Sequence, residues 1–273
     1  MNEKILTKWL APAKLNLFLH IIGQREDGYH LLQTVFQFID LCDVLEFEIR
    51  NDHQIVLESP FKEHDLIYRA AFALQQRFGV SQGVSIQIEK HIPIGGGLGG
   101  GSSDAATTLL ALNEIWQLHQ TPTQLADIGI KLGADVPVFV HGKAAWAEGI
   151  GEQFTSIELP EPYFVVIKPD CSVATADIFR DPHLTRNTKP ITMRAFFAGQ
   201  GHNDCQAVAC KQYPAIQTAL NWLNQFGTAK LTGTGACVFA AFEEKSQAEQ
   251  IHQQSPWQSW VVKGYNLSPA LQR

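Results

Sequence analysis

The sequence predicts an α+β protein of two domains: a first domain that carries a glycine-rich phosphate loop and a second domain with a ferredoxin-like fold. Three observations support this prediction. The chain has 273 residues, 45 % of them hydrophobic, which is enough for one large core or two ordinary ones. Six glycines stand among residues 95–101, between a strand pattern and a helix pattern. The second half alternates strand and helix patterns in a split β-α-β order.

Alternating apolar and polar residues in the first half predict half-buried strands. These strands are expected over residues 14–21, 30–39, 44–49, 54–58 and 84–89. Residues 134–139 form a further apolar segment that we expect to be buried. Residues 144–154 are expected to form a hairpin that turns at Gly149-Ile150-Gly151.

Capping residues indicate where the helices of the first half begin and end. Asp65 is suited to begin a helix that Gly79 would end. Thr121 and Gln124 have the spacing of a capping box, so a further helix is expected from there to Gly133.

The second half has the order expected of a ferredoxin-like sandwich. Strands are predicted over residues 163–168, 230–231, 236–242 and 260–263, and helices over residues 175–179, 214–226 and 246–252, with a polar link before the long helix. We place the domains at residues 1–157 and 158–273, because Pro160 and Pro162 interrupt the strand and helix patterns beside this division.

The glycine-rich segment is the most informative part of the chain. Glycines without Cβ atoms let successive amides point toward one ligand, and amides at a helix N-terminus bind phosphate. Ser102-Ser103-Asp104 is typical of an N-cap sequence, here for a helix that extends to about Leu118. The residues expected to bind the phosphates are Ile94, Gly95, Gly96, Gly97, Leu98, Gly99, Gly100, Gly101, Ser102, Ser103 and Asp104.

Other glycine-rich loops fit this segment less well. A Walker A loop is excluded because no lysine lies between Ile94 and Asp104. Gly95, Gly97 and Gly100 satisfy a dinucleotide fingerprint, but the expected strand ending in an acidic residue is missing about twenty residues later. A flexible linker would not be framed by a strand and a helix.

Composition excludes several classes of protein. The formal net charge is −6, so a general nucleic-acid surface is not expected. The five cysteines are an odd number without C-x-x-C spacing, and the ten histidines lack the spacing of metal ligands. No apolar run approaches the length of a membrane span. We therefore expect a cytoplasmic protein with reduced thiols, no metal site of its own, and no nucleic-acid or membrane partner.

Six segments together resemble a known family. A-P-A-K-L-N (residues 11–16), P-I-G-G-G-L-G-G-G-S-S-D-A-A (93–106) and T-G-T-G-A-C-V-F (232–239) resemble the three motifs of the GHMP small-molecule kinases. R-E-D-G-Y-H (25–30), G-A-D-V-P (133–137) and A-T-A-D-I-F (174–179) are similar to motifs of one branch of that superfamily. The resemblance implies a GHMP-kinase-like fold and, for this branch, a cytidine-diphosphate-linked methylerythritol as the small-molecule substrate.

The resemblance implies that ATP phosphorylates the 2-hydroxyl of that alcohol, in the non-mevalonate isoprenoid pathway. Lys14 and Asp135 are then the catalytic residues: Asp135 orients the hydroxyl and accepts its proton late, and Lys14 offsets the charge of the transferred group. Mg²⁺ is expected to be held mainly by the phosphates of ATP, and the sequence does not choose among Ser102, Ser103 and Asp104 as a contact. Taken alone, Lys14 could be an exposed charge at a strand edge and Asp135 a turn cap.

The substrate-binding residues implied by the resemblance are Asn16, Tyr29, His30, Thr175 and Phe179. Tyr29 and Phe179 are expected to stack on the cytosine, and His30 to bond its edge. Asn16 and Thr175 are expected to hold sugar or phosphate groups. Because Tyr29 and Phe179 come from different halves of the chain, the pocket is expected in the cleft between the domains. Without the resemblance, Tyr29 and Phe179 would be interpreted as ordinary aromatic residues of the core.

Two other kinds of function stay open on the sequence. The chain could phosphorylate another small alcohol, such as homoserine, mevalonate or galactose, although these carry no base on which Tyr29 and Phe179 could stack. It could also be a silent nucleotide-binding regulator or a dinucleotide-dependent oxidoreductase, but the presence of both Lys14 and Asp135 argues against a silent protein. Monomer and weak homodimer are both compatible with the sequence.

Overall fold

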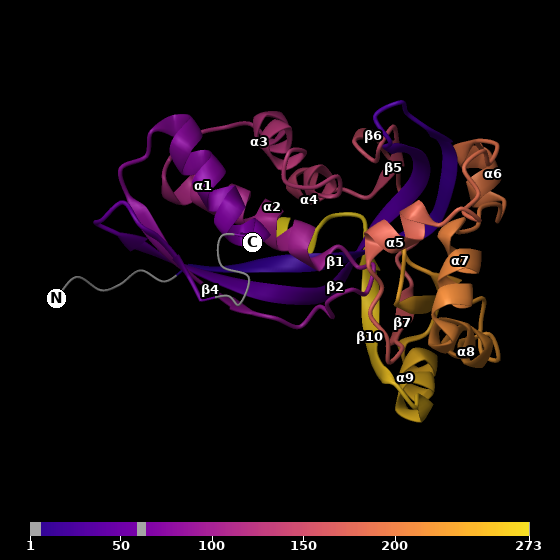
Figure 1. Ribbon diagram of the computed structural model, residues 1–273. Helices are drawn as coiled ribbons and strands as arrows, with labels where there is room; N and C mark the ends of the chain where they lie inside the picture. The colour runs from indigo at the N-terminus through magenta and orange to yellow at the C-terminus, as the bar shows by residue number, and fades with distance from the viewer. Residues whose placement is uncertain (1–6, 59–63, 273) are drawn as a thin grey trace.

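Two lobes joined by long strands make up the computed structural model, which describes residues 7–58 and 64–272 (Figure 1). Strands β1 (Thr7–Gln24) and β2 (His30–Arg50) form an antiparallel pair that runs from one lobe into the other. Residues 30–39 and 44–49, predicted as two strands, are therefore one strand. A register shift between Pro12 and Ala13 of β1 accommodates the residues between them, as a β-bulge does.

The first lobe is a sheet covered by helices on one face (Figure 1). Strands β3 (Ile55–Leu57) and β4 (Gly83–Glu89) extend the sheet beyond β2. Its helices are α1 (Leu66–Phe78), α2 (Gly100–Ile115), α3 (Pro122–Gly129) and α4 (Val136–His141). Apolar residues of α1, α2 and α4 pack against β1, β2 and β4 in a single core. This packing fixes α2 and α4, whose N-caps, Gly99 and Asp135, both line the cleft described below.

Local signals predicted most of these elements correctly. Asp65 caps α1 by accepting a hydrogen bond from the backbone N–H of Ile67, and Gly79 ends that helix in the left-handed conformation. Thr121 and Gln124 form the predicted capping box of α3, although this helix ends at Gly129 instead of residue 133. The predicted hairpin consists of β5 (Ala145–Glu148) and β6 (Gln153–Ser156).

The second lobe has the strand order of a ferredoxin-like sheet. Its strands are β7 (Tyr163–Lys168), β8 (Lys230–Leu231), β9 (Val238–Phe242) and β10 (Gln258–Tyr265), arranged as β10-β7-β9-β8. Its helices are α5 (Thr175–Arg180), α6 (Met193–Phe197), α7 (Cys205–Gln212), α8 (Pro214–Leu223) and α9 (Lys245–Gln254). Helices α6 and α7 lie in the segment predicted as a polar link, which was wrong for those residues.

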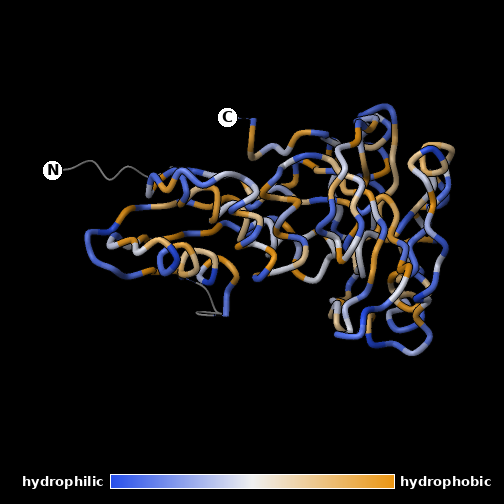
Figure 2. Tube along the Cα trace, turned by 90° about the horizontal axis from the view of Figure 1, so that it is seen from above, coloured by the Kyte–Doolittle hydropathy of each residue, from blue (hydrophilic) through white to orange (hydrophobic). Residues whose placement is uncertain are grey.

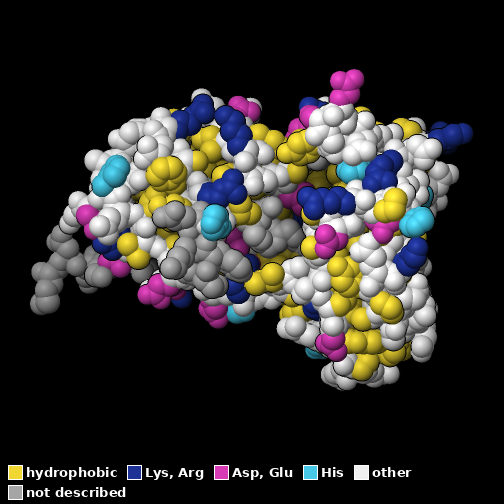
Figure 3. Space-filling view, viewed as in Figure 1, with side chains coloured by type: hydrophobic (Ala, Val, Ile, Leu, Met, Phe, Trp, Pro, Cys, Tyr) yellow, Lys and Arg dark blue, Asp and Glu magenta, His cyan; other side chains and the backbone are white. Residues whose placement is uncertain are grey.

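The two lobes share one continuous sheet, because Gly264 and Tyr265 of β10 pair with Ile39 and Phe38 of β2. Hydrophobic residues follow the inner parts of the trace, and hydrophilic residues occupy the loops at its outer ends (Figure 2). Lys and Arg side chains are scattered over the face seen in Figure 3 without a continuous basic patch. Across residues 7–58 and 64–272, no helix has the length and apolar character needed to cross a membrane. We propose that the domains divide in the link between β6 and β7.

Candidate active site

A cleft of about 720 Å³ collects most of the predicted site residues from both lobes. Its lining includes Lys14, Asn16, residues 94–102, Asp104, Asp135, Thr175 and Phe179. Among the described residues predicted for the site, Ser103, Tyr29 and His30 lie outside this lining. The cleft therefore brings together the glycine-rich loop, strand β1, the start of α4 and the start of α5.

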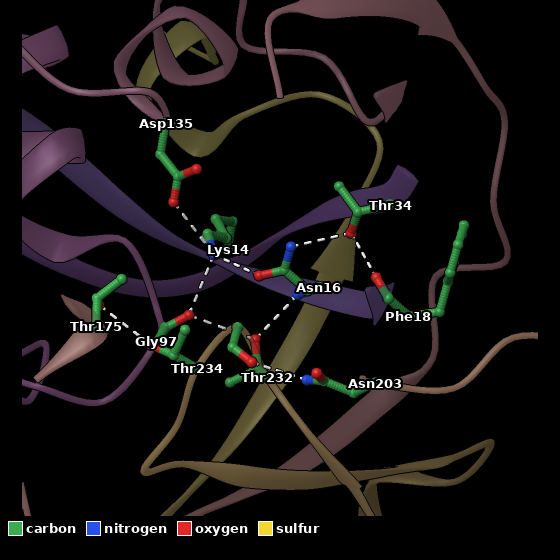
Figure 4. Close-up of polar contacts among 11 residues, drawn as sticks. Lys14, Asn16, Phe18, Thr34, Gly97, Asp135, Thr175, Asn203, Thr232 and Thr234 are labelled. Atoms are coloured by element: carbon green, nitrogen blue, oxygen red, sulfur yellow. Dashed lines mark hydrogen bonds and ion pairs between the residues drawn. The ribbon is translucent and has the colours of Figure 1, made fainter. Parts of the chain in front are cut away.

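Lys14 is at the centre of this cleft. It is only 3 % exposed, so it is no edge charge on the surface of the sheet. Its Nζ donates to Asn16 Oδ1 at 2.5 Å and to the carbonyl oxygen of Gly97 at 3.1 Å, and lies 3.4 Å from Asp135 Oδ2 (Figure 4). Strand alternation explains why Lys14 and Asn16 share a face. One ammonium group thus links strand β1, the glycine-rich loop and the carboxylate before α4.

Asp135 occupies the N-cap position of α4, but its side chain makes no capping hydrogen bond with any described residue. Its side chain is 36 % exposed and points toward Lys14 (Figure 4). A turn cap would use the carboxylate on its own backbone, whereas here the carboxylate faces the cleft. The geometry leaves one carboxylate oxygen beside a buried cation and the other open to a ligand.

Asn16 connects strand β1 with the late glycine loop, residues 232–235. Its backbone N–H donates to Thr232 Oγ1 at 3.0 Å, and its Nδ2 donates to Thr34 Oγ1 at 3.0 Å (Figure 4). Asn203 supports the same loop, since its Nδ2 donates to the carbonyl oxygens of Leu231 and Gly233. Thr34 and Asn203 were missed from the sequence, because neither lies in a segment whose spacing suggests a site.

The glycine-rich loop is held against the late glycine loop by backbone contacts. The N–H groups of Ala236 and Cys237 donate to the carbonyl oxygens of Gly95 and Gly96 at 2.9 and 3.0 Å. Gly97 has φ +74°, and a Cβ atom there would lie 2.3 Å from the carbonyl oxygen of Thr232. Glycine is required at this position by both conformation and space.

Helix α2 begins earlier than predicted. Its N-cap is Gly99 in the left-handed conformation, so Ser102-Ser103-Asp104 lies inside the helix and the prediction that these residues cap it was wrong. Ser102 still lines the cleft, whereas the side chain of Ser103 is fully buried. Residues 95–99 form the turn that brings the chain to the helix N-terminus, and Gly95, Gly97 and Gly99 have positive φ there.

Asp104 belongs to a buried cluster beside the glycine-rich loop. Lys90 Nζ donates to Asp104 Oδ2 at 2.8 Å and to Asp43 Oδ2 at 2.5 Å. Burial raises the pKa of Asp104 to about 7, although Lys90 acts in the opposite direction. Burial also disfavours the charged form of Lys90, but the two carboxylates outweigh it and raise the Lys90 pKa. Lys90 lines the cleft and was missed, because its partners lie far away in the sequence.

Phe179, which lines the cleft, stacks on His30, which lies outside that lining. The His30 imidazole lies parallel to the Phe179 ring, with centroids 4.9 Å apart and an interplanar angle of 25°. Arg186 Nε donates to His30 Nε2 at 3.0 Å, so the neutral imidazole carries its proton on Nδ1. Burial and then the Arg186 charge lower the pKa of His30. Tyr29 is 57 % exposed, so it is not a core aromatic.

Thr175 stands at the start of α5, and its hydroxyl lies 3.1 Å from the hydroxyl of Thr234 (Figure 4). This contact ties the second lobe's first helix to the late glycine loop. For a metal ion, the described residues offer no group of three or more His, Cys, Asp or Glu side chains. The described side chains therefore do not offer the ligands of a metal site made by the protein alone. An ion bound by the phosphate oxygens of a ligand needs few protein ligands.

Comparison with known proteins places the chain among small-molecule kinases. Residues 65–143 match the family described as GHMP kinases N terminal domain, and residues 192–254 match GHMP kinases C terminal. A protein of Nitrosococcus oceani named 4-diphosphocytidyl-2-C-methyl-D-erythritol kinase is 56 % identical over 266 residues, covering 95 % of each chain. The protein of that name from Pseudomonas aeruginosa is 52 % identical over 264 residues, covering 94 % of each.

Solved structures show the same relationship. A crystal structure of 4-(cytidine 5'-diphospho)-2C-methyl-D-erythritol kinase aligns with a TM-score of 0.83 and 31 % identity, covering 94 % of this chain and 99 % of that one. A mevalonate kinase from Methanococcus jannaschii aligns with a TM-score of 0.67 over 97 % of this chain, but at 16 % identity it shows the shared fold alone.

Proposed function

The chain belongs to the GHMP kinases, in the family of 4-diphosphocytidyl-2-C-methyl-D-erythritol kinases, and we propose that it transfers the γ-phosphoryl group of ATP to the 2-hydroxyl of that alcohol. The observation that carries the proposal is the position of Lys14 Nζ, between the Gly97 carbonyl of the glycine-rich loop and the Asp135 carboxylate. A group bound by the loop and a group bound by Asp135 would meet at this lysine.

ATP binding is assigned to the glycine-rich loop, residues 94–104, and the N-terminus of α2. Unpaired N–H groups at a helix N-terminus favour a phosphate, and the positive-φ glycines give the backbone close access to it. Mg²⁺ bound to the phosphates would neutralise part of their charge. Ser102 is the side chain of the Ser-Ser-Asp segment best placed for a phosphate, because Ser103 is buried and Asp104 is paired with Lys90.

Asp135 and Lys14 are assigned to the phosphoryl transfer. The substrate oxygen forms a bond to the γ-phosphorus while the bond from that phosphorus to the β-bridging oxygen breaks, and ADP leaves with the electron pair. Asp135 orients the hydroxyl and receives its proton as the new bond forms. Lys14 stays fixed by Asn16 and Gly97 and stabilises charge on the transferred group without reorganisation.

The cytidine end of the substrate is assigned to the His30–Phe179 region. Parallel rings already stacked at 4.9 Å offer a flat surface that extends to a third ring. The neutral His30 leaves Nδ1–H as a donor for a base edge. Tyr29 lies exposed beside this pair in sequence and is proposed as the second stacking ring. Asn16 and Thr175 are proposed to contact the sugar and diphosphate between the two ends.

The protein is further proposed to act in the cytoplasm, as a monomer or a weak homodimer, on a small molecule alone. Its five cysteines are free thiols, which fits a reducing compartment. The net charge of −6 gives no attraction to nucleic acid or anionic lipid.

A coupled ADP-release assay tests the proposed function. Mg-ATP is offered with 4-diphosphocytidyl-2-C-methyl-D-erythritol and, in separate reactions, with methylerythritol phosphate, mevalonate, homoserine and galactose. Turnover with the cytidylated alcohol alone is expected. Turnover with another alcohol would retain the kinase and overturn the cytidine pocket, and ATP binding without turnover on any alcohol would overturn the proposed activity.

A further inference from the structure

A second cavity, of about 500 Å³, lies outside the cleft, between strand β1, helices α7 and α8 and strand β8. This volume is far larger than the roughly 30 Å³ that one water molecule occupies in the liquid. Its polar lining includes Lys230, Gln206, Gln217 and His202. No aspartate or glutamate stands among the described residues that line it.

Lys230 is the partly buried lysine of this cavity, and it differs from Lys14 and Lys90. Each of those two lysines lies within ion-pair distance of at least one carboxylate. For Lys230, the described part of the chain supplies no carboxylate oxygen within 4.0 Å of Nζ. Burial accordingly lowers its pKa. A partly buried cation without a counter-ion is costly, and proteins rarely retain one without a ligand or a structural need.

The structural need met by Lys230 is small. Its Nζ donates one hydrogen bond, of 3.3 Å, to the carbonyl oxygen of Leu17, where β1 has an irregular register with β2. An ammonium group has three donors, so this bond leaves two for other partners. Gln206 accepts a hydrogen bond from the N–H of Leu231 through Oε1 and thereby retains its amide NH₂ group as a donor.

From this arrangement we propose that the second cavity is a binding site for a small molecule carrying a phosphate or carboxylate group, with Lys230 as its counter-ion and Gln206 as a neighbouring donor. An oxyanion would supply the charge that the cavity lacks, and a charge-assisted bond from a desolvated ammonium is stronger than one in open water. The site is separate from the ATP and alcohol sites, and it adjoins the late glycine loop through Leu231.

Cys210 makes the proposal testable, since its partly buried thiol lines the same cavity. The full-length protein is treated with iodoacetamide in the absence and presence of inorganic pyrophosphate or, in a separate arm, malonate. Alkylation of each cysteine is followed by mass spectrometry. A ligand at ten times its Kd should slow alkylation of Cys210 roughly tenfold, because about a tenth of the sites stay open. The two arms distinguish a phosphate ligand from a carboxylate ligand.

Other cysteines provide internal controls for this measurement. Cys171 precedes Ser172, which packs against Gly95 of the glycine-rich loop, so this partly buried thiol is the control on the side of the cleft. Cys42 is partly buried elsewhere and should be unaffected. Protection of Cys171 without Cys210 would place the anion in the cleft only and overturn the proposal, and so would an unchanged rate at Cys210 in both arms.

Variants separate a ligand site from a structural role of Lys230. Lys230→Met removes the charge and should abolish the protection of Cys210, whereas Lys230→Arg should retain it. Gln206→Glu keeps the acceptor for Leu231 and introduces a fixed carboxylate into the cavity, so it should also abolish the protection. Lys211→Met, an exposed change next to Cys210, is the matched control and should behave as the unchanged protein. Equal protection of Cys210 in the Lys230→Met and unchanged proteins would overturn the proposal. If Lys230→Met fails to fold, the same comparison is made with Gln206→Glu.

Discussion

The backbone N–H of Asn16 donates to the hydroxyl of Thr232 at 3.0 Å, across 216 residues of sequence. The Thr232 hydroxyl in turn donates to the carbonyl oxygen of Gly97 at 3.4 Å. One buried hydroxyl therefore links strand β1, the glycine-rich loop and the late glycine loop, which are the three segments that carry the family motifs. Through Asn16, this link also supports Lys14, whose ammonium donates to the Asn16 side chain.

Thr232→Val tests this link, because it keeps the shape of the side chain and removes the hydroxyl. The buried N–H of Asn16 then lacks its acceptor, which costs about 1–3 kcal/mol. We expect a corresponding loss in the free energy of unfolding, measured by urea denaturation, together with a lower kcat. Thr228→Val, at an exposed position before β8, is the control. Equal free energies of unfolding for the two variants would show that the Thr232 hydroxyl does not stabilise the fold.

Gly97→Ala tests the close approach of the two glycine loops. At φ +74°, with a Cβ position 2.3 Å from the Thr232 carbonyl oxygen, alanine is both strained and obstructed. Strain of this kind costs about 1–3 kcal/mol, so the loop should shift and the KM for ATP should rise in steady-state assays. Gly23→Ala is the control outside the loop, since Gly23 has no positive φ and a Cβ there meets only Leu31, at 3.4 Å. A KM for ATP that is unchanged in Gly97→Ala would contradict the assigned phosphate loop.

Asp104→Asn tests the buried carboxylate beside Lys90. Because the folded-state pKa is raised, to about 7, Asp104 contributes stability at low pH that is lost as pH rises toward and through that value. The unchanged protein should therefore lose on the order of 2 kcal/mol of unfolding free energy from this group between pH 5 and 8. Asparagine does not titrate, so the difference in unfolding free energy should shift in favour of the variant as pH rises.

The measurement for Asp104 is urea denaturation of both proteins at pH 5, 6.5 and 8. Asp127→Asn, which changes an exposed carboxylate of α3, is the control and should show no such shift. A difference between Asp104→Asn and the unchanged protein that stays constant across this pH range would contradict the raised pKa.

Phe179→Ala tests the ring that lines the cleft and stacks on His30. Loss of stacking on a base costs about 1–3 kcal/mol, so the KM for the cytidylated alcohol should rise roughly ten- to hundredfold while the KM for ATP is retained. Phe197→Ala, which removes an exposed ring of α6, should leave both constants unchanged. A parallel rise in both KM values would indicate damage to the fold instead of a lost base contact.

Local signals in the sequence were sufficient for the elements whose ends are determined by neighbouring residues. Asp65 and Gly79 bound α1, and Thr121 with Gln124 begins α3, because capping acts within one turn of helix. The same local reasoning failed at α2, where the left-handed Gly99 begins the helix before the serines are reached. The pattern of apolar and polar residues between α5 and α8 also did not indicate the short helices α6 and α7.

The parts of the site that the sequence did not predict depend on long-range contacts. Lys90 bonds Asp43 and Asp104, and Arg186 bonds His30, over separations that no spacing rule detects. The motif resemblance brought Lys14, Asp135 and Phe179 into consideration, and the fold places them around one cleft. What the resemblance left unassigned was the set of residues that hold these side chains in place.

The central claim, that Asp135 aligns the substrate hydroxyl beside Lys14, is tested most directly by single-turnover phosphoryl transfer in Asp135→Asn. Asp135 Oδ2 lies 3.4 Å from Lys14 Nζ. The asparagine amide keeps the shape of the carboxylate while removing its charge and basicity. With saturating Mg-ATP and the cytidylated alcohol, the rate of product formation should fall roughly 100- to 1000-fold, and ATP affinity should be unchanged. A single-turnover rate close to that of the unchanged protein would contradict the account.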